Sequence, residues 1–331
     1  MQRAIPDRDR LLYPAAGGNY GKDYVLRAFK DSKHVVRMVD AGIFQASLAK
    51  ARALSDLVRT ELPLSAGICV VAGEILALGG LPSIPVAALG FATGFFISGS
   101  AMITNEYFDL EVDRINHPDR PLPSGRVTIP EMALMAVLFS IGGLVAAALL
   151  SPVLLALAAL LLVIGILYNW KLKEAGLPGN MMVAASVGMT FVCGGMAAGK
   201  PLSGVVWTFG AMAFLFDLAE EIAGGAMDME GDRQRGARTV ALTYGRQPAL
   251  RVSMLLFAGF IGLSLLPYLA GWLGYGYLAA ILLADTAIAY LAFGLYRSLT
   301  PQDGRANMRR LYLTMTLMIV VILLLIVANI A

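Results

Sequence analysis

The chain has little charge, very few cysteines and only two histidines. Of its 331 residues, 15% are charged and 58% are hydrophobic, whereas a soluble domain usually carries about 25% charged residues. The two cysteines, Cys69 and Cys193, lie far apart in apolar segments, so neither a disulfide framework nor a cysteine metal site is expected. The net charge of +3 is too small to favour nucleic acid as a partner. These features exclude a disordered chain, a small secreted disulfide-rich domain and an ordinary soluble enzyme, and they indicate a membrane protein.

Apolar segments long enough to span a membrane make up most of the chain, since a span needs roughly 20 residues to cross about 30 Å of hydrocarbon. There are nine of them, at residues 62–80, 82–104, 129–150, 152–169, 180–199, 203–223, 252–270, 274–296 and 311–330. The sequence therefore predicts an all-α, polytopic protein with nine transmembrane helices. Because no apolar run precedes residue 62, we expect no cleavable signal peptide.

The basic residues of the loops predict the orientation of the spans. Fifteen Lys and Arg residues follow position 60, and fourteen of them lie in the alternate loops 105–128, 170–179, 224–251 and 297–310. Only Lys200 lies on the other side. Since basic loops stay in the cytoplasm, we expect an integral protein of the cell membrane with a cytoplasmic N-terminus and a C-terminus outside.

The first part of the chain has a different composition from the rest. It holds 11 Lys and Arg against 6 Asp and Glu within its first 60 residues, and residues 37–58 alternate between apolar and charged positions at helical spacing. We expect residues 1–58 to form a cytoplasmic basic tail and an interfacial amphipathic helix on anionic headgroups. Residues 59–331 are then the nine-helix domain.

Two clusters of acidic residues lie at the cytoplasmic ends of the second and sixth predicted spans. Asn105, Asp109 and Asp113 are spaced four residues apart, so they share one face of a helix. Asp228 and Asp232 repeat this spacing. Oxygen ligands of this kind suit Mg²⁺, which binds through one or two carboxylates together with substrate phosphates. The pattern predicts two acidic faces opposed across a cytoplasm-facing cavity, where bridging metal ions would hold a diphosphate. Simple solvation of helix-end acids is the alternative.

The motifs around these acids resemble those of a known family. The pattern N-x-x-x-D-x-x-x-D at 105–113 is followed by I-N-x-P-x-R-P-x-P-S-G-R up to 126, and D-x-E-G-D-x-x-x-G-x-x-T spans 228–239. With the segment 168–173 and residues 179–180, they resemble the UbiA superfamily of intramembrane prenyltransferases, from about residue 55 to the C-terminus. Within it, the first motif is most similar to the archaeal geranylgeranylglyceryl-phosphate geranylgeranyltransferases, which build ether lipids. Chlorophyll synthases share parts of this loop.

The resemblance implies Mg²⁺-dependent transfer of a prenyl group from a polyprenyl diphosphate, geranylgeranyl diphosphate, to a lipophilic acceptor, geranylgeranylglyceryl phosphate. It implies catalytic roles for Asp109, Asp113, Asp228 and Asp232, and Mg²⁺ binding by these four with Asn105. The expected substrate-binding residues are Arg120, Arg126, Lys171, Lys173, Glu221, Arg233, Tyr168 and Asn169. Membrane lipids are expected partners and nucleic acid is not.

One stretch departs from the family pattern. Enzymes of this subfamily carry an R-E-I-x-K-like run before the second acidic motif, and here residues 220–224 read E-E-I-A-G. Both basic residues are missing. Either the diphosphate is bound more weakly, or Lys171, Lys173 or Arg233 supplies the charge, or the reaction has diverged.

Other functions remain open at this point. The acceptor could be an aromatic, quinone-precursor or chlorophyll-type compound, or the chain could be a membrane terpene cyclase, a branch in which Asp109 tends to be lost. A transporter would place its acidic residues near the membrane midplane, whereas most acids here lie at cytoplasmic ends. Of the acids inside predicted spans, we expect Asp217 to line the cavity, and Glu74 and Asp285 to form structural hydrogen bonds or to serve the acceptor.

Overall fold

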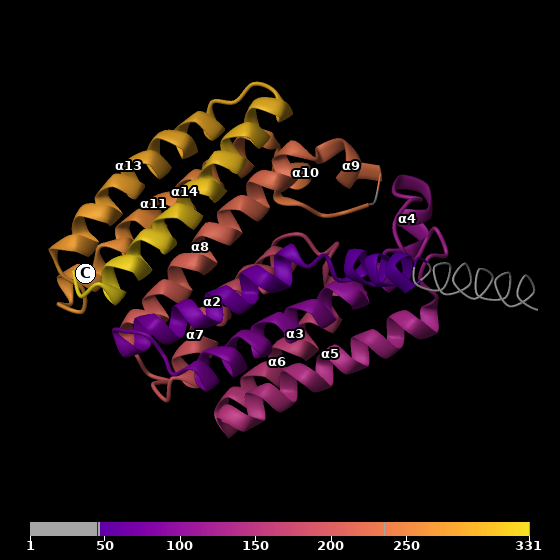
Figure 1. Cartoon of the computed structure of the whole chain (residues 1–331). Coiled ribbons are helices and arrows are strands. Elements are labelled where there is room, and N and C mark those ends of the chain that lie inside the picture. The colour runs from indigo at the N-terminus through magenta and orange to yellow at the C-terminus, as the bar shows by residue number, and fades with distance from the viewer. Residues whose placement is uncertain (1–44, 46, 235, 331) are drawn as a thin grey trace, which may run out of the picture. The chain divides into compact units, whose positions relative to one another are not determined.

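The computed structural model describes residues 45, 47–234 and 236–330 (Figure 1). The chain divides into two compact units, residues 1–52 and residues 53–331. Most of the expected basic tail lies outside the described residues, although residues 47–58, part of the predicted amphipathic segment, are helical. The division of the chain at residue 58 stays a prediction.

The larger unit is helical, and its described residues contain no strand. Each of the nine predicted apolar segments coincides with a long helix among the described residues: α2 (Glu61–Leu78), α3 (Ile84–Phe108), α5 (Ile129–Leu150), α6 (Pro152–Leu167), α7 (Leu177–Ala197), α8 (Gly204–Met227), α11 (Arg246–Ser264), α13 (Tyr275–Tyr296) and α14 (Pro301–Val327). The prediction of an all-α protein is confirmed. Short elements connect these helices: α4 (Leu110–Asn116), the π-helical turn η1 (Tyr168–Leu172), α9 (Met229–Gln234), α10 (Val240–Tyr244) and α12 (Leu266–Leu269).

Eight helices in the described part of the chain are long and apolar enough to cross a membrane. Helix α8 is not among these eight, because it carries Asp217, Glu220 and Glu221 within its 24 residues. The chain is thus an integral membrane protein, and the count of nine spans stays a prediction.

Local sequence signals set the helix ends. Thr128 and Glu131 form a capping box at the start of α5, which satisfies backbone N–H groups that have no partner within the helix. The Ser151 side chain accepts a hydrogen bond from the Leu154 N–H at 3.1 Å, with Pro152 in the first turn of α6. Helix α2 ends at Gly79, whose φ of +69° favours glycine. Short turns therefore separate apolar runs that follow one another closely.

Small residues let the helices of the bundle approach one another. At Gly194 in α7, an added Cβ would lie 2.0 Å from the Val70 carbonyl oxygen in α2. At Gly73 in α2, it would lie 2.2 Å from the Phe191 carbonyl oxygen in α7. Such close backbone contact is typical of membrane helices, where packing rather than the hydrophobic effect holds helices together.

The motif-bearing loops lie at one end of the bundle. Figure 1 shows α4, α9 and α10 near that end, whereas the C-terminus lies at the opposite end. Helix α4 continues directly from α3, and α9 continues from α8. The fold therefore brings two motifs together that are about a hundred residues apart in the sequence.

Candidate functional site

A cavity of about 790 Å³ opens at this end of the bundle. Of the sequence-predicted site residues, nine line it: Asn105, Asp109, Asp113, Arg120, Tyr168, Lys173, Glu221, Asp228 and Asp232. All five predicted metal ligands are in this group. The first motif and the second motif therefore contribute to the same cavity.

The junction between α3 and α4 forms the first acidic face. The Asp109 N–H donates to the Asn105 carbonyl at 2.9 Å, and the Asp113 N–H donates to the Asp109 carbonyl at 2.8 Å. The helical hydrogen-bond pattern thus continues through Asp109, so the three side chains stay on one face. Asn105 and Asp113 are buried, and the Asp109 side chain is 22% exposed.

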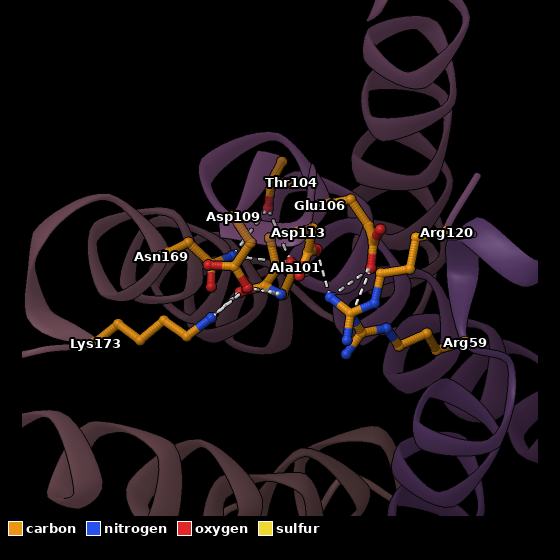
Figure 2. A network of polar contacts seen from close by, with 10 residues as sticks. Arg59, Ala101, Thr104, Glu106, Asp109, Asp113, Arg120, Asn169 and Lys173 are labelled. Carbon is orange, nitrogen blue, oxygen red and sulfur yellow. Dashed lines mark hydrogen bonds and ion pairs between the residues drawn. The ribbon is translucent and has the colours of Figure 1, made fainter. Parts of the chain in front are cut away.

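Lys173 approaches this face from η1. Its Nζ lies 2.5 Å from Asp109 Oδ2 and 3.0 Å from Asn105 Oδ1, and Asn105 Nδ2 donates to Asp109 Oδ2 at 3.0 Å (Figure 2). The turn η1 is fastened by Asn169, whose Nδ2 donates to the Ala101 carbonyl at 2.9 Å and to Thr104 Oγ1 at 3.2 Å. Asn169 is not among the cavity-lining residues. Asn169 thus joins η1 to α3 just before Lys173, and its predicted role in substrate binding stays a prediction.

Arginines approach the same face from the other side (Figure 2). Arg120 forms an ion pair with Asp113, and Arg59 Nη2 lies 2.5 Å from Oε1 of the buried Glu106. Both arginines line the cavity. Arg59 was not predicted from the sequence, since it precedes the first span and lies outside every motif.

The junction between α8 and α9 forms the second acidic face. Asp228 ends α8, and the Asp232 N–H donates to the Asp228 carbonyl at 2.9 Å. Asp228 forms an ion pair with Arg305 from α14, and Arg305 also donates to the Met227 carbonyl at 3.3 Å. Cations from three separate elements thus contact Asp109, Asp113 and Asp228.

Helix α14 contributes residues that the sequence analysis missed. Met308, Arg309 and Tyr312 line the cavity. Arg309 follows Arg305 by four residues, and Tyr312 follows Arg309 by three, so these three side chains share one helical face. This spacing is visible in the sequence and could have indicated a polar face on the last helix. In the sequence analysis, the arginines of this helix indicate only the orientation of the chain.

Three predicted phosphate-binding residues do not line the cavity. Lys171 lies over the Trp170 ring, with its Nζ 4.3 Å from the ring centroid. Arg233 pairs with Glu230 at 2.9 Å on the surface. Arg126 pairs with Asp56 at 2.9 Å beside a smaller pocket of about 400 Å³. Lys171 and Lys173 are two residues apart, so the turn directs them to different sides.

The cavity wall formed by α8 is acidic. Asp217, Glu220 and Glu221 line it together with Gly224, so both positions where the family pattern has a basic residue face the cavity without one.

Two other buried acids do not line the cavity. Asp285 accepts a hydrogen bond from Ser264 at 2.7 Å and thus joins α13 to α11. Glu74 is fully buried in α2 and does not line the cavity.

The donor set fits Mg²⁺. It consists of carboxylate and amide oxygens, which hard cations prefer. No three Asp, Glu, His or Cys side chains of the described residues converge closely enough to hold an ion by themselves. Mg²⁺ needs no such cage, because it keeps water ligands and shares substrate phosphates with one or two carboxylates.

Comparison with known proteins places the chain among intramembrane enzymes. The model of the UbiA prenyltransferase family matches residues 66–328. The digeranylgeranylglyceryl phosphate synthase of Methanopyrus kandleri is 40% identical over 240 residues, covering 72% of this chain and 86% of that protein. The same synthase of Thermococcus kodakarensis is 36% identical over 247 residues, covering 75% and 88%.

Solved structures share the fold. One, described as digeranylgeranylglyceryl phosphate synthase in membranes, has a TM-score of 0.74 at 26% identity and covers 84% of this chain and 99% of that chain. A UbiA homolog from Archaeoglobus fulgidus bound to GPP and Mg²⁺ has a TM-score of 0.60 at 17% identity, covering 83% and 99%. At that identity it shows the fold alone. From the match over most of its length and from its relatives, the chain belongs to the UbiA prenyltransferase family.

Proposed function

We propose that the chain is a Mg²⁺-dependent prenyltransferase that moves a geranylgeranyl group from geranylgeranyl diphosphate to geranylgeranylglyceryl phosphate, forming an ether lipid precursor. The observation that carries this proposal is the single cavity lined by both acidic faces, Asn105 to Asp113 and Asp228 to Asp232. The names of the relatives support the acceptor. A homolog of the same fold is bound to GPP and Mg²⁺, so this fold can accommodate the metal together with a prenyl diphosphate.

In this proposal the two acidic faces would hold Mg²⁺ together with the donor diphosphate. Asp109, Asp113, Asp228 and Asp232 would be the ligands, with the Asn105 amide oxygen beside them. Bound Mg²⁺ would neutralise the charge that develops on the departing pyrophosphate. Lys173 and Arg120 are already at hydrogen-bonding distance from the acids of the first face, so they are placed to donate to phosphate oxygens.

The reaction begins with ionisation of the donor. The bond between the allylic carbon and the diphosphate oxygen breaks, the acceptor hydroxyl then forms the new ether bond, and its proton leaves to a carboxylate or to the pyrophosphate. The described residues lining the cavity include no Cys–His or Ser–His pair, and the proposed reaction uses no covalent enzyme intermediate. The allylic cation must be kept from water until the acceptor hydroxyl attacks it.

The orientation belongs to the same proposal. The cavity and the N-terminus face the cytoplasm of the cell membrane, and the C-terminus lies outside. The basic loops at the cavity end of the bundle support this orientation, since Arg120, Lys173 and Arg309 all lie at that end. A water-soluble diphosphate leaving group would then be released into the cytoplasm.

Product analysis tests the proposed function. Purified protein is incubated with geranylgeranyl diphosphate, Mg²⁺ and a panel of acceptors, and the products are identified by mass spectrometry. We expect geranylgeranylglyceryl phosphate to gain one geranylgeranyl group, and the product to disappear when EDTA removes Mg²⁺. Transfer only to an aromatic or chlorophyll-type acceptor would overturn the proposed acceptor. A cyclic hydrocarbon formed without any acceptor would overturn the proposed transfer.

A further inference from the structure

Arg309 differs from the other cations that line the cavity. Arg59, Arg120 and Lys173 each form an ion pair with an acidic residue. For Arg309, the described residues provide no ion pair and no hydrogen-bond partner for its side chain, although it lines the same cavity. Its guanidinium group is therefore available to an anion from outside the chain.

Arg309 also lies on a different wall from those three cations. Helix α14 packs against α8, α13 and α2, and the Met308 Cε would lie 3.8 Å from a Cβ added to Gly224. Lys173 and Arg120 instead contact the acids of α3 and α4. Among the described residues of α8 and α14 that line the cavity, Arg309 is the only cation.

The side chains that α8 presents to the cavity restrict where a phosphate can bind. Asp217, Glu220 and Glu221 of α8 all line the cavity, and carboxyl side chains offer no positive charge to a phosphate. The proposed reaction needs two phosphate-bearing substrates in one cavity at the same time. Since both acidic faces serve Mg²⁺ and the donor diphosphate in the proposed reaction, the acceptor phosphate needs a cation that no acidic residue of the described chain already pairs with.

We infer that Arg309 binds the phosphomonoester of the acceptor and selects a phosphate-bearing lipid. This inference rests on the proposed function. A guanidinium group donates two parallel hydrogen bonds to phosphate. Tyr312, one turn further along the same face of α14, also lines the cavity and offers a hydroxyl donor. Gly224 leaves space beside α14 at the position where the family pattern has a lysine.

Steady-state kinetics with two acceptors test the inference. The acceptors are geranylgeranylglyceryl phosphate and geranylgeranylglycerol, which lacks the phosphate. Loss of charge-assisted hydrogen bonds in Arg309→Gln should raise the KM for the phosphorylated acceptor by about 10- to 100-fold. The KM values for the unphosphorylated acceptor and for geranylgeranyl diphosphate should each stay within about twofold of the wild-type values.

Two further variants serve as controls. Arg309→Lys keeps the positive charge, so it should recover part of the lost affinity for the phosphorylated acceptor. Arg310→Gln, an exposed neighbour outside the cavity, is the matched control and should behave as wild type.

Two results would overturn the inference. An equal KM for the phosphorylated acceptor in wild type and Arg309→Gln would exclude Arg309 from the acceptor site, while transfer by both proteins would leave the proposed function standing. A rise in the KM for geranylgeranyl diphosphate would instead assign Arg309 to the donor diphosphate.

Equilibrium binding of the acceptor tests the role of Arg309 without any need for turnover. Binding of geranylgeranylglyceryl phosphate is measured without Mg²⁺ or donor, and we expect it to be about tenfold or more weaker in Arg309→Gln. Equal binding to both proteins contradicts the inference even if no product forms. Failure of the proposed function would appear differently, as an absence of product from a wild-type protein that still binds this lipid through Arg309.

Discussion

At the residue scale, Asp109 and Asp228 are each paired with a cation from a distant part of the chain. Lys173 contacts Asp109, 64 positions away, and Arg305 contacts Asp228, 77 positions away. No local pattern in the sequence indicates such pairs. The five oxygen ligands could be identified from the sequence, because residues spaced four apart share one face of a helix.

Two neighbouring lysines, Lys171 and Lys173, test which cation serves the proposed diphosphate site. Lys173→Gln removes a donor from the proposed diphosphate site and leaves Asp109 without its cation, so we expect kcat/KM for the prenyl diphosphate to fall by about 10- to 100-fold. Lys171→Gln is the matched control, since Lys171 lies over Trp170 outside the cavity. It should change kcat/KM by less than about threefold. The opposite ranking would show that the turn at η1 directs the other lysine to the substrate.

At the element scale, all nine apolar segments were located from composition and length. Less predictable were the π-helical turn at η1 and the contribution of α14 to the cavity. The sequence of η1, Tyr168–Leu172, contains no signal for a π turn, and this turn places Lys173 at the site. Helix α14 meets α8 only through tertiary packing. The spacing of its cavity-lining residues shows that they share one face of the helix. The sequence does not show that this face lies beside α8.

Two glycines test the close packing of the helices. In Gly194→Ala the new Cβ would meet the Val70 carbonyl oxygen at 2.0 Å, so α2 and α7 must separate, and we expect a loss of about 1 to 3 kcal/mol in stability. In Gly142→Ala the nearest atom is Phe96 Cδ2 at 3.4 Å, which is ordinary contact. Thermal unfolding in detergent should show a lower Tm for the first variant and little change for the second. Equal Tm values would contradict the packing between α2 and α7.

At the scale of the whole molecule, we expect the cavity end of the bundle to face the cytoplasm and the opposite end to face the outside of the cell. Single cysteines at Ser124, Gly236 and Leu202, in a chain lacking Cys69 and Cys193, are labelled with an impermeant reagent in intact cells. We expect label only at position 202, because the other two belong to the basic loops at the cavity end. Positions 124 and 236 should react after permeabilisation. Label from opposite sides at 124 and 236 would contradict the topology.

The central claim is that two acidic faces, one from each motif, together hold Mg²⁺ and the donor diphosphate. It is tested most directly by measuring turnover of geranylgeranyl diphosphate by Asp109→Ala and Asp232→Ala, with Glu111→Ala as the control. Glu111 pairs with Arg114 on the exposed side of α4 and does not line the cavity. We expect each aspartate variant to fold but to lose at least about 100-fold in turnover, whereas Glu111→Ala should keep wild-type activity. Full turnover by either aspartate variant in the presence of Mg²⁺ would show that its acidic face does not hold the metal and the diphosphate.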